Sequence, residues 1–301
     1  MKCPICNTEI GASIRSKYFP HFSTCPVCTG HFAMDARAVE YPDVYFNRAG
    51  ERSFFARVFS PFMSLFFRLR LGVITSAIRA TPHAKVLDYG CGTGALVARL
   101  RREGFDALGY EPSPAAVAEA VAHSIPVFSA LSEGRFDLIM FWHSLEHVDH
   151  PFNVITSLKE HLNPYGKLLA AIPNGGSWEA KLAGDRWFHY DYPFHRMQYT
   201  PISLEKLFHA AGFRIQRMNF FNPDYTIAGL VQTFLNFFLP KNALYSVLTH
   251  RRANFGSLAA IGIFTAAVLL VVIFSPLLIL FYLAALITKN TGAIIVVAER
   301  I

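Results

Sequence analysis

The sequence is poor in charged residues, and the shortage is uneven along the chain. Charged side chains make up 16% of the 301 residues and hydrophobic ones 52%, whereas ordinary soluble domains carry about 25% charged residues. No aspartate or glutamate lies between residues 225 and 289, and residues 258–287 carry no charge of either sign. A bilayer core needs only about twenty such residues, and a core helix is seldom so uniformly apolar. The composition therefore favours a membrane-associated segment over a buried core helix.

The net charge of +7 is confined to one part of the chain. Residues 1–47 are neutral, with four basic and four acidic side chains, and the residues after 85 add only +1. Residues 48–85 hold one acid, Glu51, and seven basic residues: Arg48, Arg52, Arg57, Arg68, Arg70, Arg79 and Lys85. Phosphate binding requires cations along the contact surface. The neutral N-terminal segment thus argues against nucleic acid as a partner.

Cysteines are few, but four of the five form two Cys-x-x-Cys pairs: Cys3, Cys6, Cys25 and Cys28. Because Met1 leads directly into the first pair, we expect no signal peptide and a reducing compartment. Eighteen residues separate the pairs, a spacing typical of a tetrahedral four-cysteine zinc site, with two disulfides as the alternative. Such closed sites are structural. We therefore expect a zinc ribbon with a docking or substrate-shaping role.

The middle of the chain predicts an α/β fold. Residues 85–221 alternate short apolar runs with helical patterns, which is typical of a parallel sheet covered by helices. Residues 292–299 are predicted to form a last strand. If residues 213–221 form the strand next to it, the apolar stretch is an insertion between two strands of one sheet.

A glycine-rich turn follows the first predicted strand. Residues 86–89 are apolar apart from Asp88. A turn follows, with glycines at Gly90, Gly92 and Gly94, and a helix is predicted to start at Ala95. Glycines let the backbone approach a ligand closely. The Gly-x-Gly-x-Gly spacing differs from the Gly-x-Gly-x-x-Gly of dinucleotide sites. A second strand ends at Glu111, where a carboxylate can accept both hydroxyls of a ribose.

Residues 86–111 resemble the first two motifs of class I S-adenosylmethionine-dependent methyltransferases, in particular small-molecule enzymes of the ubiquinone-biosynthesis type. The resemblance continues through residues 136–140, 143–148 and 162–169, and covers roughly 85–225 and 291–301. It implies a Rossmann-like seven-stranded sheet and S-adenosylmethionine as cofactor. The cofactor residues that it implies are Asp88, Gly90, Cys91, Gly92 and Gly94 around the methionine, and Glu111 on the ribose. The family often has an acid after its third strand, near the adenine; here Ser129 is the candidate.

The acceptor side is expected in residues 185–196, which are crowded with aromatic and titratable groups. Methyl transfer needs an acceptor positioned in line with the sulfonium, and a hydroxyl acceptor also needs a base. His195 is the first candidate for this base. The alternatives are His143, His147, His189 and Asp191, and each of these residues can equally be part of the pocket wall.

The apolar insertion is predicted to form a membrane hairpin. Ser275-Pro276 supplies a break, because proline cannot donate within a helix. The limbs, 258–274 and 277–287, are then about 26 and 17 Å long, and the second is too short to span a bilayer core of roughly 30 Å. We therefore expect a re-entrant hairpin with both ends on the cytoplasmic face, where Arg251, Arg252 and Lys289 flank it. Two full crossings are the alternative.

The domains expected are a zinc ribbon at 1–47, a basic aromatic helical segment at 48–84, a methyltransferase domain at 85–224 and 290–301, and the membrane-associated insert at 225–289. Residues 53–71 either lie on an anionic membrane surface or pack on the methyltransferase domain. The leading hypothesis is a membrane-associated methyltransferase acting on a small-molecule or lipid-linked acceptor, such as a quinone precursor or polyprenol-linked sugar. The alternatives are a ribosomal RNA methyltransferase with a zinc module, and an inactive zinc-bearing membrane adaptor.

Overall fold

The computed structural model describes residues 1–35, 54–78, 83–131, 134–249 and 257–301. Within these ranges the side chains of residues 54–64, 223–224 and 257 are not described. Residues 48–53 and 79–82 of the predicted basic helical segment lie outside the described residues, as do Arg251 and Arg252.

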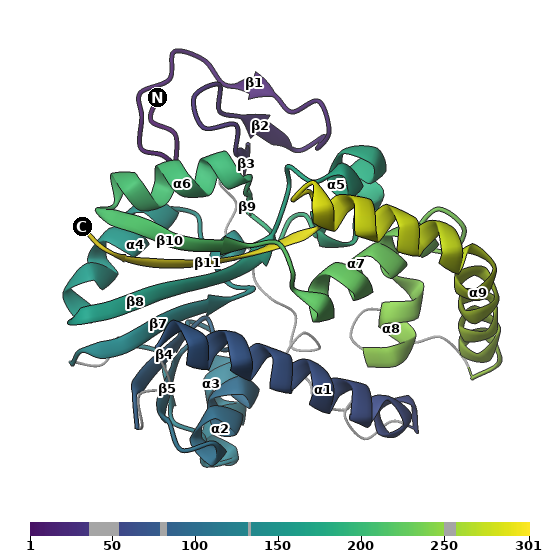
Figure 1. Cartoon of the computed structure of the whole chain (residues 1–301), viewed down its shortest axis with the longest axis horizontal. Coiled ribbons are helices and arrows are strands. Elements are labelled where there is room, and N and C mark those ends of the chain that lie inside the picture. Colours follow the sequence, from purple (N-terminus) through teal and green to yellow (C-terminus); the bar gives the residue numbers. More distant parts are fainter. Residues whose placement is uncertain (36–53, 79–82, 132–133, 250–256) are drawn as a thin grey trace.

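A seven-stranded sheet forms the centre of the molecule, in the order β10-β11-β8-β7-β4-β5-β6 (Figure 1). β4, β5, β6, β7 and β8 are parallel, whereas β11 is antiparallel to both of its neighbours. The strands are β4 (Lys85–Tyr89), β5 (Asp106–Tyr110), β6 (Val127–Phe128), β7 (Phe136–Trp142), β8 (Leu162–Pro173), β10 (Phe213–Asn219) and β11 (Ala293–Arg300). The predicted α/β sheet is confirmed, with the insertion before its last strand.

Helices cover both faces of this sheet (Figure 1). On one face, buried side chains of α4 (Pro151–Leu158) and α6 (Pro201–Ala210) share a core with β7, β8 and β11. On the other, α1 (Phe54–Ala77), α2 (Ala95–Arg102) and α3 (Pro114–Ala122) bury Ile74, Val97 and Ala120 in a second core. The C-terminal half of α1 thus packs on the domain.

A second, four-stranded sheet joins the N-terminal segment to this domain. Its order is β1 (Ile14–Arg15), β2 (Phe22–Thr24), β3 (His31–Ala33) and β9 (Met197–Gln198). The last of these strands belongs to the segment between β8 and α6, and His31 pairs with Gln198 in antiparallel register. The ribbon is therefore bound to the α/β domain by main-chain hydrogen bonds.

The predicted break at Ser275-Pro276 is wrong. One continuous helix, α9 (Ser257–Ile287), runs through Pro276, so the chain forms neither a hairpin nor two crossings. A proline within a helix removes one hydrogen bond and displaces the preceding turn, which bends the helix without ending it. Figure 1 shows α9 bent into two limbs. It follows α5 (Trp178–Ala183), α7 (Pro223–Leu235) and α8 (Ala243–Thr249) in the chain.

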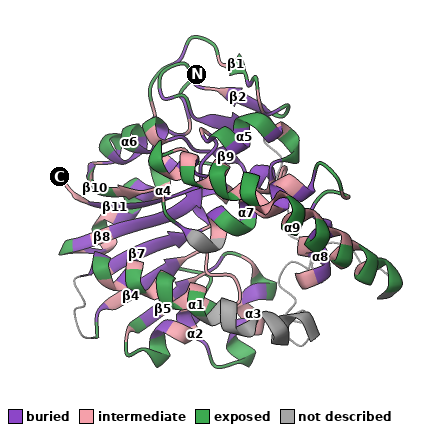
Figure 2. Cartoon of the chain, turned by 45° about the vertical axis from the view of Figure 1, so that its right-hand side comes forward, coloured by how far each residue is buried: buried purple, intermediate pink, exposed green. Residues whose placement is uncertain are grey.

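Most of α9 faces outward (Figure 2). By length and hydropathy it is the only helix in the described ranges that could cross a membrane, and just 6% of its most apolar window is buried. Leu269, Val272 and Ile273 are more than half exposed. Exposed apolar surfaces of this kind occur at membrane and protein–protein interaction sites.

Candidate functional site

The glycine turn between β4 and α2 depends on two of its glycines for close packing. Gly90 and Gly94 have φ angles of 78° and 73°, in the left-handed region. A Cβ at Gly90 would lie 2.6 Å from the Cβ of Ser144, and one at Gly94 would lie 2.7 Å from Cγ2 of Ile125. At Gly92, also left-handed with a φ of 56°, nothing lies within 4 Å of an added Cβ. The turn is therefore fixed on both sides and leaves open space above its middle.

Glu111, directly after β5, faces this turn. Its Oε2 accepts a hydrogen bond from the Gly92 N–H at 2.9 Å, and its Oε1 accepts one from the Ser113 N–H at 3.0 Å. A carboxylate has about four lone-pair positions, so two remain for ribose hydroxyls. The structure thus brings together the two features, 21 positions apart, that the sequence singles out for a nucleoside.

Cys91 and Ser129 occupy different environments. The Cys91 thiol packs towards Gly109, whose missing Cβ makes room for it, and burial raises the pKa of this thiol. The side chain is therefore a packing group, and only the main chain of Cys91 borders the turn. Ser129 lies exposed after β6, beside Phe128, which is 47% exposed. The end of β6 therefore presents an exposed aromatic ring and a hydroxyl that could contact the adenine of the cofactor.

A cation that the sequence interpretation did not select lies beside the turn. The Arg70 guanidinium of α1 stacks 4.7 Å from the centroid of the Trp142 ring, at the end of β7. Burial raises the pKa of Asp88 to about 7, an effect that Arg70 opposes and Glu111 increases. Arg70 and Asp88 could hold the carboxylate and the ammonium of a methionine moiety. Arg70 lies twenty positions before the turn and resembles any other cation of a basic helix, so no sequence pattern marks it as a cofactor residue.

The pKa of Asp88 predicts a pH-dependent cofactor affinity. An ammonium group favours the ionised carboxylate, so binding must remove the proton that Asp88 carries below pH 7. The affinity for S-adenosylhomocysteine is expected to rise about tenfold from about pH 6 to pH 8, measured by calorimetry. Asp88→Asn should remove this rise, and Asp106→Asn, at the exposed start of β5, should keep it. A rise that persists in Asp88→Asn contradicts the assignment.

On the acceptor side, His143 follows β7 directly with a φ of 54°. Its Nδ1 lies 3.4 Å from Oε1 of Glu146, in the 3₁₀ helix η3 (Leu145–His147). Its ring stacks on Tyr225 of α7. Nε2 is buried and has no hydrogen-bond partner among the described residues. An imidazole oriented through one nitrogen, with the other available, is the arrangement that a general base needs.

Glu146 and the other histidines form a cluster behind His143. Burial alone would raise the pKa of Glu146, but the imidazoles of His143, His195 and His147 hold it at about 2. Nδ1 of His195 donates to the His189 carbonyl at 2.8 Å, and Nδ1 of His147 donates to the Phe194 carbonyl at 3.0 Å. One donor atom from each of Glu146, His147 and His195 lies within 4.8 Å of the others. This set could hold a metal ion.

The remaining acceptor-side candidates have structural contacts. Burial lowers the pKa of His195 to about 4 and that of His189 to about 3, so both are neutral near pH 7. Asp191, with a φ of 25°, accepts the His195 N–H through its main-chain carbonyl. The sequence-predicted groups are therefore together, but His143 is the one adjacent to the glycine turn, through Ser144.

The four N-terminal cysteines also meet in space. All are buried and free of disulfides, and their Sγ atoms lie within 4.8 Å of one another. The distances are 3.9 Å for Cys3–Cys28 and 4.0 Å for Cys6–Cys25. Four thiolates about 2.3 Å from a tetrahedral zinc ion lie about 3.8 Å apart. The donor set fits zinc.

This ribbon contacts the acceptor segment. Phe19 stacks on Trp187 and Tyr190, with 6.0 Å between centroids in both pairs. Arg196 donates to Asp35 of the ribbon at 3.0 Å and to Asp149 at 2.8 Å. The ribbon is therefore the outer support of the segment that carries His189 and His195.

The family model described as a methyltransferase domain matches residues 67–217. Ubiquinone biosynthesis O-methyltransferases of Escherichia coli K12 and Shigella boydii are 30% identical over 131 residues, which cover 38% of this chain and 55% of each relative. The chain thus spans about half the length of the curated relatives it matches.

Solved structures with a similar backbone include the [4+2]-cyclase SpnF, at a TM-score of 0.49 and 19% identity, covering 78% of this chain and 80% of that one. An S-adenosylmethionine-dependent methyltransferase from Mesorhizobium loti matches at a TM-score of 0.44 and 17% identity, covering 75% of this chain and 96% of that one.

Proposed function

Because the chain belongs to the methyltransferase-domain family, as a class I S-adenosylmethionine-dependent methyltransferase, we propose that it methylates a hydroxyl of a small-molecule or lipid-linked acceptor at the cytoplasmic face of a membrane. One chain of contacts carries this proposal. Tyr225 stacks on His143 in the acceptor site, and the next residue, Thr226, lies 3.5 Å from the Tyr282 hydroxyl of the apolar helix α9. The candidate base and the exposed apolar helix are thus two contacts apart.

The cofactor residues proposed are the glycine turn, with Glu111 for the ribose and Asp88 and Arg70 for the methionine end. Bound S-adenosylmethionine supplies a methyl group on a positively charged sulfur. The protein's part is to position that end against the acceptor and to keep water out. The open space above Gly92 and the two remaining acceptor positions of Glu111 support this fit.

His143 is proposed as the base, in place of His195. Its Nδ1 lies 3.4 Å from Oε1 of Glu146, which stays ionised because its pKa is about 2, and we propose that Nδ1 carries the resting proton. Nε2 then accepts the hydroxyl proton, and the neighbouring carboxylate stabilises the imidazolium that forms. His195 is buried two residues before β9, with its ring against that of His147, and we propose it as part of the supporting cluster.

The membrane contact proposed is interfacial. Straight, the 31 residues of α9 would reach about 46 Å, more than a bilayer core. Its C-terminal end is separated from β11 by five residues, however, and Phe274 and Phe281 pack on Phe234 of α7 and Trp178 of α5. A helix held to α5 and α7 through its C-terminal half is expected to stay on the side of the membrane that carries the domain. We therefore propose that its exposed residues 258–273 lie in one leaflet, with the positive flank at Lys289 on the cytoplasmic face.

The test combines vesicle binding with methyl transfer. Purified protein is expected to sediment with anionic phospholipid vesicles, and to transfer labelled methyl groups into a lipid extract. Leu269→Glu combined with Val272→Glu should lose vesicle binding but keep affinity for S-adenosylhomocysteine, because α9 lies away from the glycine turn. Ile14→Glu, an exposed apolar position in the ribbon, is the matched control. Label found only in water-soluble products would contradict the lipid-linked acceptor.

A further inference from the structure

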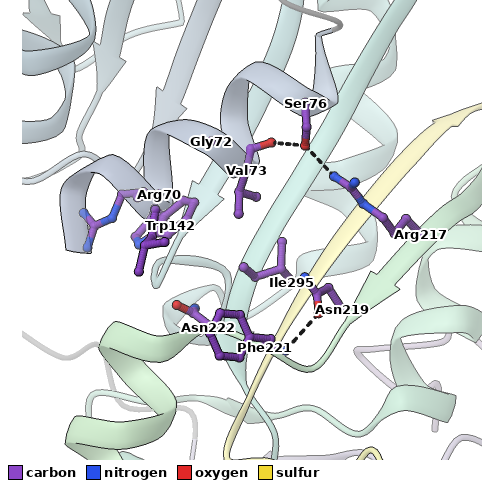
Figure 3. A pocket seen from close by; sticks show the side chains of 11 residues that line it. Arg70, Gly72, Val73, Ser76, Trp142, Arg217, Asn219, Phe221, Asn222 and Ile295 are labelled. Carbon is purple, nitrogen blue, oxygen red and sulfur yellow. Dashed lines mark hydrogen bonds between the residues drawn. The ribbon is translucent and has the colours of Figure 1, made fainter. Parts of the chain in front are cut away.

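A cavity of about 210 Å³ lies between α1 and the ends of β7 and β10. Figure 3 shows its lining, in which Arg70 and Val73 come from α1 and Trp142 from β7. Arg217 on β10 and Asn222 just before α7 complete the polar part of the wall. Neither the proposed base nor the glycine turn belongs to this lining.

The polar groups of the cavity are predominantly hydrogen-bond donors, and no aspartate or glutamate is among the described residues that line it. Trp142 Nε1 and Asn222 Nδ2 are both buried and have no hydrogen-bond partner within the described part of the chain. The two residues are only 8% and 2% exposed. In Figure 3 the amide of Asn222 points towards the indole of Trp142. Buried donors are almost always satisfied, so two such groups facing one cavity indicate a ligand that accepts hydrogen bonds.

Two guanidinium groups give the cavity a positive charge. Arg217 donates from Nη2 to Ser76 Oγ at 2.7 Å, which fixes its head across the gap between β10 and α1 (Figure 3). A guanidinium has five donors in a planar fork, which suits carboxylate and phosphate oxygens. Arg70 lines the same cavity, with its guanidinium over the Trp142 ring. The apolar side chains of Val73 and Phe221 flank these donors.

We propose that this cavity binds an anionic oxygen group, a carboxylate or a phosphate, of the methyl acceptor. The inference rests on the proposed function and names its substrate class. Asn222 lies three residues before Tyr225, which stacks on His143, so an acceptor anchored by its anionic group here has the rest of its body beside the base. The cavity is large enough for a carboxylate or phosphate and at most a small apolar group next to it. The rest of a larger acceptor would extend towards α7 and α9.

The first experiment measures binding of simple anions by calorimetry. Benzoate and phenyl phosphate, which separate a carboxylate acceptor from a phosphate one, are titrated into the full chain in the presence of saturating S-adenosylhomocysteine. We expect one of them to bind at least tenfold more tightly than benzamide, which has the shape of benzoate but no charge. S-adenosylhomocysteine already supplies its own carboxylate to the cofactor site. If an anion binds to the protein alone but not in the presence of S-adenosylhomocysteine, the anion occupies the cofactor site, and the inference is overturned.

The second experiment uses matched variants. Arg217→Met should weaken anion binding about tenfold, as for the loss of one charge-assisted hydrogen bond. Trp142→Phe, which keeps a ring under Arg70 but removes the donor, should also weaken it. Arg214→Met removes a cation of the same strand that bonds to Glu299 instead, and should change nothing. If Arg217→Met and Arg214→Met bind the anion with equal affinity, the inference is overturned.

The two proposals fail in different ways. Tight binding of S-adenosylhomocysteine without any anion binding overturns the anion site and leaves the proposed methyltransferase function intact. Failure to bind S-adenosylhomocysteine overturns the proposed function itself, whatever the anions do.

Discussion

Replacing His143 with asparagine is expected to lower kcat for methyl transfer by about 10²–10⁴-fold, the usual contribution of a general base. Affinity for S-adenosylhomocysteine should not change. Asparagine is the substitution of choice because residue 143 has a φ of 54°, and asparagine tolerates the left-handed region better than most side chains. The decrease in kcat is then caused by the missing imidazole and not by a strained backbone. The measurement is steady-state kinetics with labelled cofactor, beside calorimetry of cofactor binding.

Two further variants separate the base from its surroundings. His123→Asn changes an exposed histidine at the end of α3, 51% exposed at its side chain, and should leave kcat unchanged. Glu146→Gln removes the charge behind His143 and should lower kcat without changing the affinity for S-adenosylhomocysteine, because the carboxylate no longer stabilises the imidazolium that forms during the reaction. A merely structural role of Glu146 would instead lower the stability of the protein and leave kcat of the folded fraction unchanged. Full activity in His143→Asn would return the role of base to His195 or His189.

The sheet and the cofactor turn could be predicted from the sequence because their signals are local. Apolar runs of strand length and the three glycines after Asp88 depend on residues that are neighbours in the chain. Glu111 is only 21 positions from Gly90, and the strand between them fixes where it lies. The seven-stranded sheet follows that expectation, and the structure adds a hydrogen bond from Gly92 to Glu111.

Features that depend on tertiary contacts were harder to predict. A pattern with four candidate histidines on the acceptor side does not show which of them lies next to the turn, and Tyr225 reaches His143 only because α7 packs there. Arg70, Arg217 and Asn222 are unremarkable in the sequence and meet through the packing of α1 on the sheet. The hairpin prediction failed because Pro276 has two outcomes, a break or a bend. The packing of α9 against α7 is consistent with the bend.

Replacing Cys25 with serine is expected to abolish metal binding and to disorder the acceptor segment while cofactor binding remains. Purified wild-type protein should contain about equimolar zinc, and the variant none, by elemental analysis. Zinc bound to four thiolates contributes about 10–16 kcal/mol to folding of small zinc modules, so the ribbon should not stay folded without it. Cys91→Ala, outside the cluster, should keep its zinc.

The consequence for the acceptor segment follows from how closely the ribbon fits. A Cβ at Gly30, two residues after Cys28, would lie 2.8 Å from the Cβ of Ser203 in the first turn of α6. On the same side Thr29 Oγ1 lies 2.9 Å from Thr200 Oγ1, the N-cap of that helix. β3 also pairs with β9. Hydrogen exchange in residues 187–198 should therefore rise sharply in Cys25→Ser, with exchange at residues 88–94 unchanged. If the amides of residues 187–198 stay protected from hydrogen exchange after zinc is lost, the acceptor segment keeps its structure without the ribbon.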